Sequence, residues 1–131
     1  MEIHVIYLLI QVVGKSNILI KWTKNKFITD HEITIGVEFG AKNIKTESKI
    51  LFRVQVWDTV TNYFNIQAGQ ETFRSITRAY YKNSVCAFLV YDITNKESFK
   101  NISSWHDECK AQSPKTTLMI LVGNKVDLAE K

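Results

Sequence analysis

Three short polar motifs contain side chains that could hold a nucleotide and a metal ion. Gly14-Lys15-Ser16 is the second half of a phosphate-binding loop, in which the lysine reaches the β and γ phosphates and the serine hydroxyl ligates Mg²⁺. If a helix starts at this tripeptide, its N-terminus also favours anions. A solvated helix start with no ligand is the alternative interpretation.

Asp58 and the segment Asn124-Lys125-Val126-Asp127 each follow an apolar run. An aspartate in the position of Asp58 can hold Mg²⁺ directly or through water, as a Walker B carboxylate does, or it can cap a helix or turn. A carboxylate at Asp127 can accept two hydrogen bonds from the guanine edge that adenine does not present, and Asn124 can reach the other ring edge. We therefore predict a guanine site, against the alternative of a chance polar loop.

These motifs need a scaffold that brings them to one place. Apolar and β-branched runs predict five strands, at 3–9, 37–45, 49–57, 85–91 and 117–122. The second and third can pair as a hairpin around the turn 46–48. Helical spacing predicts helices at 15–23, 72–83 and 96–112. This alternation predicts an α/β domain with a largely parallel sheet, whose ligands bind at the carboxyl ends of the strands.

Composition indicates one ordinary globular domain. The chain has 131 residues, of which 45% are hydrophobic and 23% charged, and this balance excludes intrinsic disorder. The net charge is +4, with 8 basic and 6 acidic residues up to residue 60 and 9 and 7 after it. Because neither half is a basic arm, we expect no nucleic-acid partner.

No feature of the sequence indicates secretion or a membrane span. The apolar start is too short to cross a bilayer and lacks the basic flank and cleavage site of a signal peptide. Cys86 and Cys109 have neither CxxC nor metal-ligand spacing, so we interpret them as free or structural thiols, with a disulfide as the alternative. We therefore expect a cytoplasmic domain.

Four further strings resemble small GTPases of the Rab family. They are Ile35-Gly36-Val37-Glu38-Phe39, Ala68-Gly69-Gln70-Glu71-Thr72-Phe73, Tyr91-Asp92-Ile93-Thr94 and Gly123-Asn124-Lys125-Val126-Asp127. The resemblance covers 14–59 and 68–131, and the first string favours the Rab branch over Ras and Rho. It implies the P-loop NTPase (small G-protein) fold with one antiparallel strand, GTP binding, and slow GTP hydrolysis as a molecular switch in vesicle-mediated transport.

The resemblance also implies a role for each matching residue at the phosphates. Gly14 and Lys15 would contact the phosphates, Ser16 and Thr34 would ligate Mg²⁺, and Asp58 would hold the ion through water. Gly69 would sense the γ-phosphate through its backbone N–H, and Gln70 would be the catalytic residue that orients the attacking water.

Two further groups of residues take roles from the resemblance. Phe27, Asn124, Lys125 and Asp127 would bind guanine, although Phe27 could instead cover the core. Phe39, Trp57 and Tyr80 match the aromatic triad through which Rab proteins contact effectors, and without the resemblance all three would be interpreted as core residues. The implied partners are GTP or GDP, exchange factors, GTPase-activating proteins and effectors of a monomer. Family members reach endomembranes through a C-terminal lipid anchor, and we expect no such anchor in residues 1–131.

Three departures from the Rab pattern modify these expectations. Leu9 and Val12 occupy positions where the phosphate loop has glycines that permit close backbone approach, so we expect weak nucleotide binding or none. Residues 60–67 separate Asp58 from Gly69 and Gln70, which would displace both from the γ-phosphate. The chain also stops before the last strand and helix, so we expect a single truncated domain over 1–131.

Residues 60–67 allow two explanations. The segment starts with valine, whose codon begins GT, and ends with glutamine, which some genetic codes read from TAG, so it could be a retained short intron. The competing explanation is a genuine switch-region insertion. Two functional hypotheses follow: a GTP-hydrolysing switch, or a nucleotide-binding-defective fragment or wrongly defined gene product that offers at most an effector-type surface.

Overall fold

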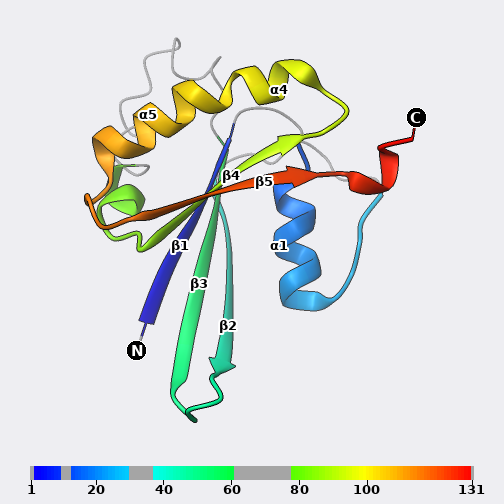
Figure 1. Cartoon of the computed structure of the whole chain (residues 1–131). Coiled ribbons are helices and arrows are strands. Elements are labelled where there is room, and N and C mark those ends of the chain that lie inside the picture. The colour runs from blue at the N-terminus through cyan, green and yellow to red at the C-terminus, as the bar shows by residue number, and fades with distance from the viewer. Residues whose placement is uncertain (1, 10–12, 30–36, 61–77, 131) are drawn as a thin grey trace.

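The strands form one five-stranded sheet. The computed structural model describes residues 2–9, 13–29, 37–60 and 78–130. In these ranges the strands are β1 (Glu2–Leu9), β2 (Val37–Lys45), β3 (Leu51–Val60), β4 (Cys86–Asp92) and β5 (Leu118–Asn124). Their order is β2-β3-β1-β4-β5, and only the β2–β3 pair is antiparallel (Figure 1). The predicted α/β fold with one antiparallel strand and a β2–β3 hairpin is confirmed.

The helices agree with the sequence prediction except at one point. They are α1 (Lys15–Lys24), α4 (Lys96–Lys100), α5 (Ile102–Gln112) and the 3₁₀ turn η1 (Val126–Leu128), and residues 78–82 are also helical. Residues 72–77 of the predicted helix 72–83 lie outside the described ranges. Among the described residues, no helix is long and apolar enough to cross a membrane.

The single helix predicted over 96–112 is wrong, because the chain forms two helices that are separated at Asn101. The ψ of Asn101 is −11°, far from the value of about −42° in a regular helix. Ser98 is fully buried and its Oγ accepts a hydrogen bond from the Asp92 N–H at 3.0 Å. This bond ties α4 to the end of β4, while α5 packs along β4 and β1.

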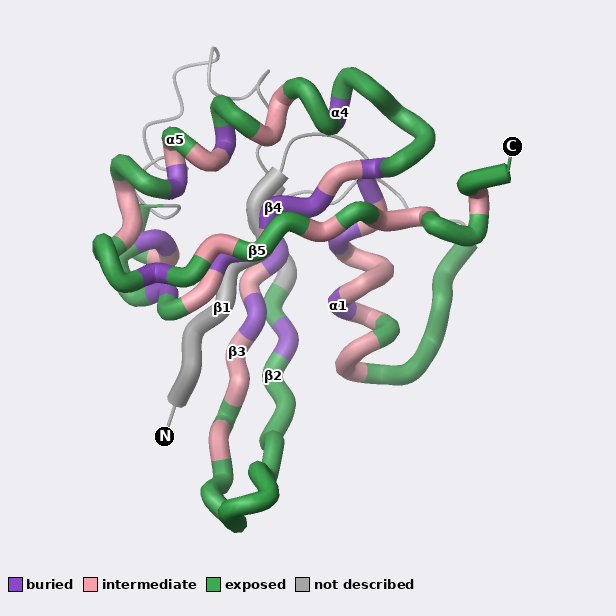
Figure 2. Tube along the Cα trace, in the orientation of Figure 1, coloured by how far each residue is buried: buried purple, intermediate pink, exposed green. Residues whose placement is uncertain are grey.

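Among the residues whose burial the structure describes, the buried apolar side chains form one cluster between the sheet and the helices. Its members are Val13, Leu19, Val56, Tyr81, Ala87, Leu89, Val90, Trp105 and Cys109. Figure 2 shows buried positions along β4 and the middle of β3, whereas the tip of the β2–β3 hairpin is exposed. Cys109 is a core residue although the sequence around it is polar. Both cysteines are free thiols, so the disulfide alternative is wrong.

Gly40 allows α1 to approach the hairpin strands closely. A Cβ at Gly40 would lie 2.6 Å from Leu19 Cδ1 and 2.8 Å from Thr23 Cγ2, so these side chains or α1 itself would have to move. Gly40 pairs with Val56 of β3, and α1 covers this face of the two strands. The close packing brings the start of α1 near β3.

We expect Gly40→Ala to lower the free energy of unfolding by about 1–3 kcal/mol, because the added methyl group overpacks the α1 contact. Urea unfolding measures the change. The matched control is Ala41→Val at the exposed neighbouring position, where we expect a change within about 0.5 kcal/mol. Equal effects at both positions would contradict the close-packing explanation.

Candidate functional site

The polar motifs lie at one edge of the sheet. Because β1, β3, β4 and β5 run parallel, their carboxyl ends share this edge, and α1 begins there too (Figure 1). The prediction that Asp58 and Asn124 follow their strands needs a correction of boundaries. Asp58 lies inside β3, which continues to Val60, and Asn124 is the last residue of β5, since the hydrogen bonding of both strands extends past the apolar runs.

The start of α1 buries a lysine beside an aspartate. Gly14 caps the helix with φ 88°, a conformation that favours glycine. Lys15 is only 7% exposed, which contradicts the alternative of a solvated helix start. Burial lowers the pKa of Lys15, and the negative charge of Asp58 partly offsets that shift. The ammonium group therefore lies in a poorly hydrated place, where its attraction for an anion is strong.

Asp58 has oxygen atoms suited to a hard cation. Its side chain is 1% exposed, and Ser16 Oγ donates a hydrogen bond to Asp58 Oδ2. Within the described part of the chain, Asp58 Oδ1 is a buried oxygen with no hydrogen-bond partner. A carboxylate and a hydroxyl fit the oxygen preference of Mg²⁺. Asp58 lies inside β3, so the alternative that it caps a helix or turn directly after the apolar run is wrong.

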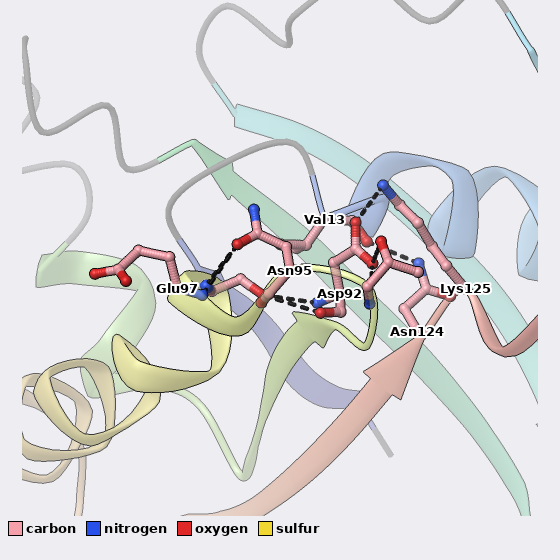
Figure 3. A network of polar contacts seen from close by, with 8 residues as sticks. Val13, Asp92, Asn95, Glu97, Asn124 and Lys125 are labelled. Carbon is pink, nitrogen blue, oxygen red and sulfur yellow. Dashed lines mark hydrogen bonds and ion pairs between the residues drawn. The ribbon is translucent and has the colours of Figure 1, made fainter. Parts of the chain in front are cut away.

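The guanine motif contacts the phosphate-loop segment directly. Asn124 Nδ2 donates a hydrogen bond to the Val13 carbonyl at 2.8 Å, across 111 positions of sequence (Figure 3). A Cβ at Gly14 would lie 2.6 Å from Asn124 Nδ2 and 3.9 Å from Lys125 Cε. Gly14 is thus required for this contact as well as for its positive φ. The end of β5 and the start of α1 form one packed unit.

Lys125 joins the same edge to β4. Its Nζ lies 2.6 Å from Asp92 Oδ2, and Asp92 Oδ1 accepts hydrogen bonds from the Thr94 N–H and Oγ1 (Figure 3). Burial alone would raise the pKa of Asp92, but the hydrogen bonds from Lys125 and Thr94 lower it below its ordinary value. Lys125 has φ 67°, an unusual conformation for a non-glycine residue, which this ion pair helps to hold.

Phe27 and Asp127 are exposed around this unit. Phe27 is 71% exposed, so the alternative that it covers the core is wrong. Its loop is fixed by Asn17, whose side-chain amide donates to the Ile28 carbonyl at 3.0 Å and accepts from the Ile28 N–H at 3.2 Å. Asp127 lies in η1 with an exposed side chain. Both side chains are therefore accessible to a ligand.

The three aromatic residues predicted as an effector surface lie in a row. The ring centroids of Phe39 and Trp57 are 4.4 Å apart, as are those of Trp57 and Tyr80. Phe39 is 47% exposed, and Trp57 and Tyr80 are half-buried. Trp57 and its neighbour Val56 point to opposite faces of β3, so the row lies on the face opposite α1. The core alternative does not hold for Phe39.

Several predicted positions lie outside the described residues. They are Thr34, Gly69, Gln70 and the segment 61–67, together with the side chains of Leu9 and Val12. Sequence reasoning missed the Val13 carbonyl, the Asp92 carboxylate and the Asn17 amide. Of these three groups, only the Asp92 carboxylate could have been found from the sequence, because it follows the apolar run of β4 and strand ends of this kind meet at the same sheet edge.

We expect Asp92→Asn to lower the free energy of unfolding by about 1–2 kcal/mol at pH 7, since a mostly buried ion pair is lost. The pKa of Asp92 is lower in the folded chain than its ordinary value of 3.8. Its contribution is therefore present above that value and is lost as the pH falls through the folded-state pKa. Urea unfolding should show that the difference in unfolding free energy between the wild type and Asp92→Asn is smaller at acid pH than at neutral pH.

The matched control is Glu97→Gln, which breaks an exposed pair at 3.1 Å between Glu97 and Lys100. We expect almost no effect there. A loss for Asp92→Asn that is the same at both pH values would contradict the role of the carboxylate charge.

Comparison with known proteins identifies the family. The model of the Ras family matches residues 5–131. The chain is 46% identical over 116 residues to the Ras-related protein Rab-2B of Dictyostelium discoideum. That alignment covers 88% of this chain and 53% of the relative, so the chain spans about half the length of the curated relative that it matches. The chain belongs to the Ras family and is of the Rab type, as its resemblance predicts.

Proposed function

We propose that this chain binds GTP and GDP with Mg²⁺ and acts as a slow GTP-hydrolysing switch in vesicle-mediated transport. Ras-family GTPases bind these nucleotides, typically with Mg²⁺. The observation that carries the proposal is the buried Lys15 beside Asp58, at the start of a helix that Asn124 links to the guanine motif. A positive group, a carboxylate and a guanine-reading loop at one sheet edge suit a guanine nucleotide.

Each described residue has a distinct task in this proposal. Lys15 Nζ and the N-terminal N–H groups of α1 bind the phosphates, and Ser16 Oγ and Asp58 hold the metal. Mg²⁺, when bound, neutralises charge on the phosphate oxygens. A serine hydroxyl can offer a lone pair to a cation while it donates its hydrogen, so the hydrogen bond from Ser16 to Asp58 is compatible with an ion held by these two residues.

In this proposal, the residues of the guanine motif bind the base through hydrogen bonds that the fold holds in place. Asp127 accepts from the guanine N1–H and exocyclic amine, and Phe27 packs on the ring. Lys125, held by Asp92, positions the backbone of the motif and packs beside Gly14. Asn124 keeps the motif in register with the phosphate loop through the Val13 carbonyl.

For hydrolysis and signalling, the proposal uses the residue roles that the resemblance to Rab proteins implies. Thr34 would complete the metal ligands, Gly69 would donate its N–H to the γ-phosphate and Gln70 would orient the attacking water, and residues 60–67 slow this step by displacing the last two. Loss of the γ-phosphate releases these segments, and the aromatic row of Phe39, Trp57 and Tyr80 reports the change to effectors. Exchange factors and GTPase-activating proteins set the cycle of a monomer that moves between cytoplasm and endomembranes.

We expect Asp127→Ala to weaken GDP binding at least roughly thirtyfold, because two charge-assisted hydrogen bonds to guanine are lost. A fluorescent GDP analogue measures Kd in the purified chain. Asp107→Ala removes an exposed carboxylate from α5 and should leave Kd unchanged.

Wild-type protein that neither copurifies with nucleotide nor binds the analogue would overturn the proposal. That result would favour the nucleotide-binding-defective alternative, which Leu9 and Val12 support.

We further propose that residues 60–67 are an insertion, arising as a retained intron, in a single domain over 1–131. Deletion of 60–67 makes Asp58-Thr59 contiguous with Ala68-Gly69-Gln70. We expect single-turnover GTP hydrolysis to accelerate by about tenfold or more, since a displacement of about 1 Å at a catalytic group can cost ~10²-fold.

Gln70→Leu in the deletion background should remove this gain. An unchanged rate after deletion would count against the insertion, and codons for 60–67 in every spliced transcript would exclude the intron.

A further inference from the structure

Basic side chains gather at the end of the molecule opposite the nucleotide edge. They come from the last turn of α1, the loop after it and the β2–β3 hairpin, and all are exposed. They are Lys21, Lys24, Lys26, Lys42, Lys45, Lys49 and Arg53. We refer to these seven residues with Ile44, Ile50 and Leu51 as the hairpin surface.

The excess of basic over acidic residues is confined to this region. Residues 21–29 and 41–55 contain seven basic residues and one acidic residue, Glu47, whereas the rest of the chain contains ten basic and twelve acidic residues. Eleven residues separate the two segments in the sequence, and the segments meet in the fold. Lys42 Nζ donates to the Trp22 carbonyl at 3.3 Å and lies 5.9 Å from the Trp22 ring centroid, which joins β2 to α1.

Exposed aliphatic side chains stand among these lysines at the hairpin tip. Ile44 is 40% exposed, Ile50 51% and Leu51 58%. The hairpin projects beyond the rest of the sheet, and its tip is exposed throughout (Figure 2). Because side chains alternate between the two faces of a hairpin, Lys42 and Ile44 lie on the face of α1, whereas Lys45, Leu51 and Arg53 lie on the opposite face. The protruding tip thus presents basic and aliphatic groups on both faces, which is the chemistry of a surface that enters the headgroup region of a bilayer.

We propose that the hairpin surface docks on an anionic lipid membrane. Clusters of four to eight basic residues bind acidic lipids electrostatically, and the aliphatic tip adds burial of apolar area. A nucleic-acid partner fits less well, because single-strand binding uses stacking aromatic residues and the large exposed side chains of this tip are aliphatic.

Docking by this surface leaves the nucleotide site free. The tip lies at the amino end of β3, whereas Asp58 and Asn124 lie near the carboxyl ends of their strands. The carboxyl edge then faces away from the bilayer and remains open to nucleotide and protein partners. The contact requires no bound nucleotide.

Sedimentation of the full chain with vesicles tests the proposal. We expect binding to phosphatidylcholine vesicles that contain phosphatidylserine, little binding to pure phosphatidylcholine, loss of binding as salt rises, and the same result with or without GDP. Lys24→Gln with Lys45→Gln should weaken partitioning about 25-fold, since each basic residue near the surface contributes about fivefold.

The matched control is Lys110→Gln with Lys115→Gln, which removes the same charge from exposed positions on and after α5 and should have little effect. Ile50→Ser with Leu51→Ser keeps the charge and should weaken binding about tenfold. Circular dichroism verifies folding of each variant.

Three results would overturn the proposal: no sedimentation of the wild type with anionic vesicles, equal losses in the two lysine pairs, or wild-type vesicle binding by the serine variant together with equally tight binding to a polyuridine RNA. The last result would identify a general polyanion site in place of a membrane surface.

Discussion

The burial of Lys15 beside Asp58 is the constraint on which the rest of the site depends. Lys15 as a whole residue is 7% exposed, so its ammonium group loses most of its hydration, and the nearby carboxylate compensates only part of that cost. The two groups can meet only if β3 lies next to β1, and the parallel register pairs Tyr7 with Asp58. The sheet order thus places a negative charge where the chain enters α1.

A second pair of contacts acts from the other side of β1. Asn124 bonds to the Val13 carbonyl, and Lys125 pairs with Asp92 at the end of β4. Strands on both flanks of β1 therefore hold the segment that leads into α1. Gly14 makes this possible because its missing Cβ is the space that Asn124 fills. Sheet topology and one glycine together explain how residues from distant parts of the sequence form a single site.

Strands were the most predictable part of the fold, because continuous apolar runs such as 85–91 describe strands buried on both faces. The break at Asn101 was not predictable from helical spacing, which continues through it. It depends on the tertiary bond between Ser98 and β4. Likewise, Asp58 could be assigned to the correct sheet edge, but its burial and its bond to Ser16 depend on contacts between elements 42 positions apart.

The charge distribution is a clearer case of a feature that the sequence analysis did not predict. Counting basic and acidic residues in two halves of the sequence gives an even spread, yet the fold joins the end of α1 to the hairpin and concentrates seven basic residues there. A count by halves misses a surface made from two short segments, because the acidic residues between and around them balance their charge. Lysine therefore serves two opposite purposes in one domain. At the carboxyl edge Lys15 is buried. The burial of its charge in isolation would lower the stability of the fold, and the same poor hydration strengthens its attraction for a phosphate. At the hairpin the lysines stay hydrated, so each contributes little alone, and only their number and the aliphatic tip between them can select a surface.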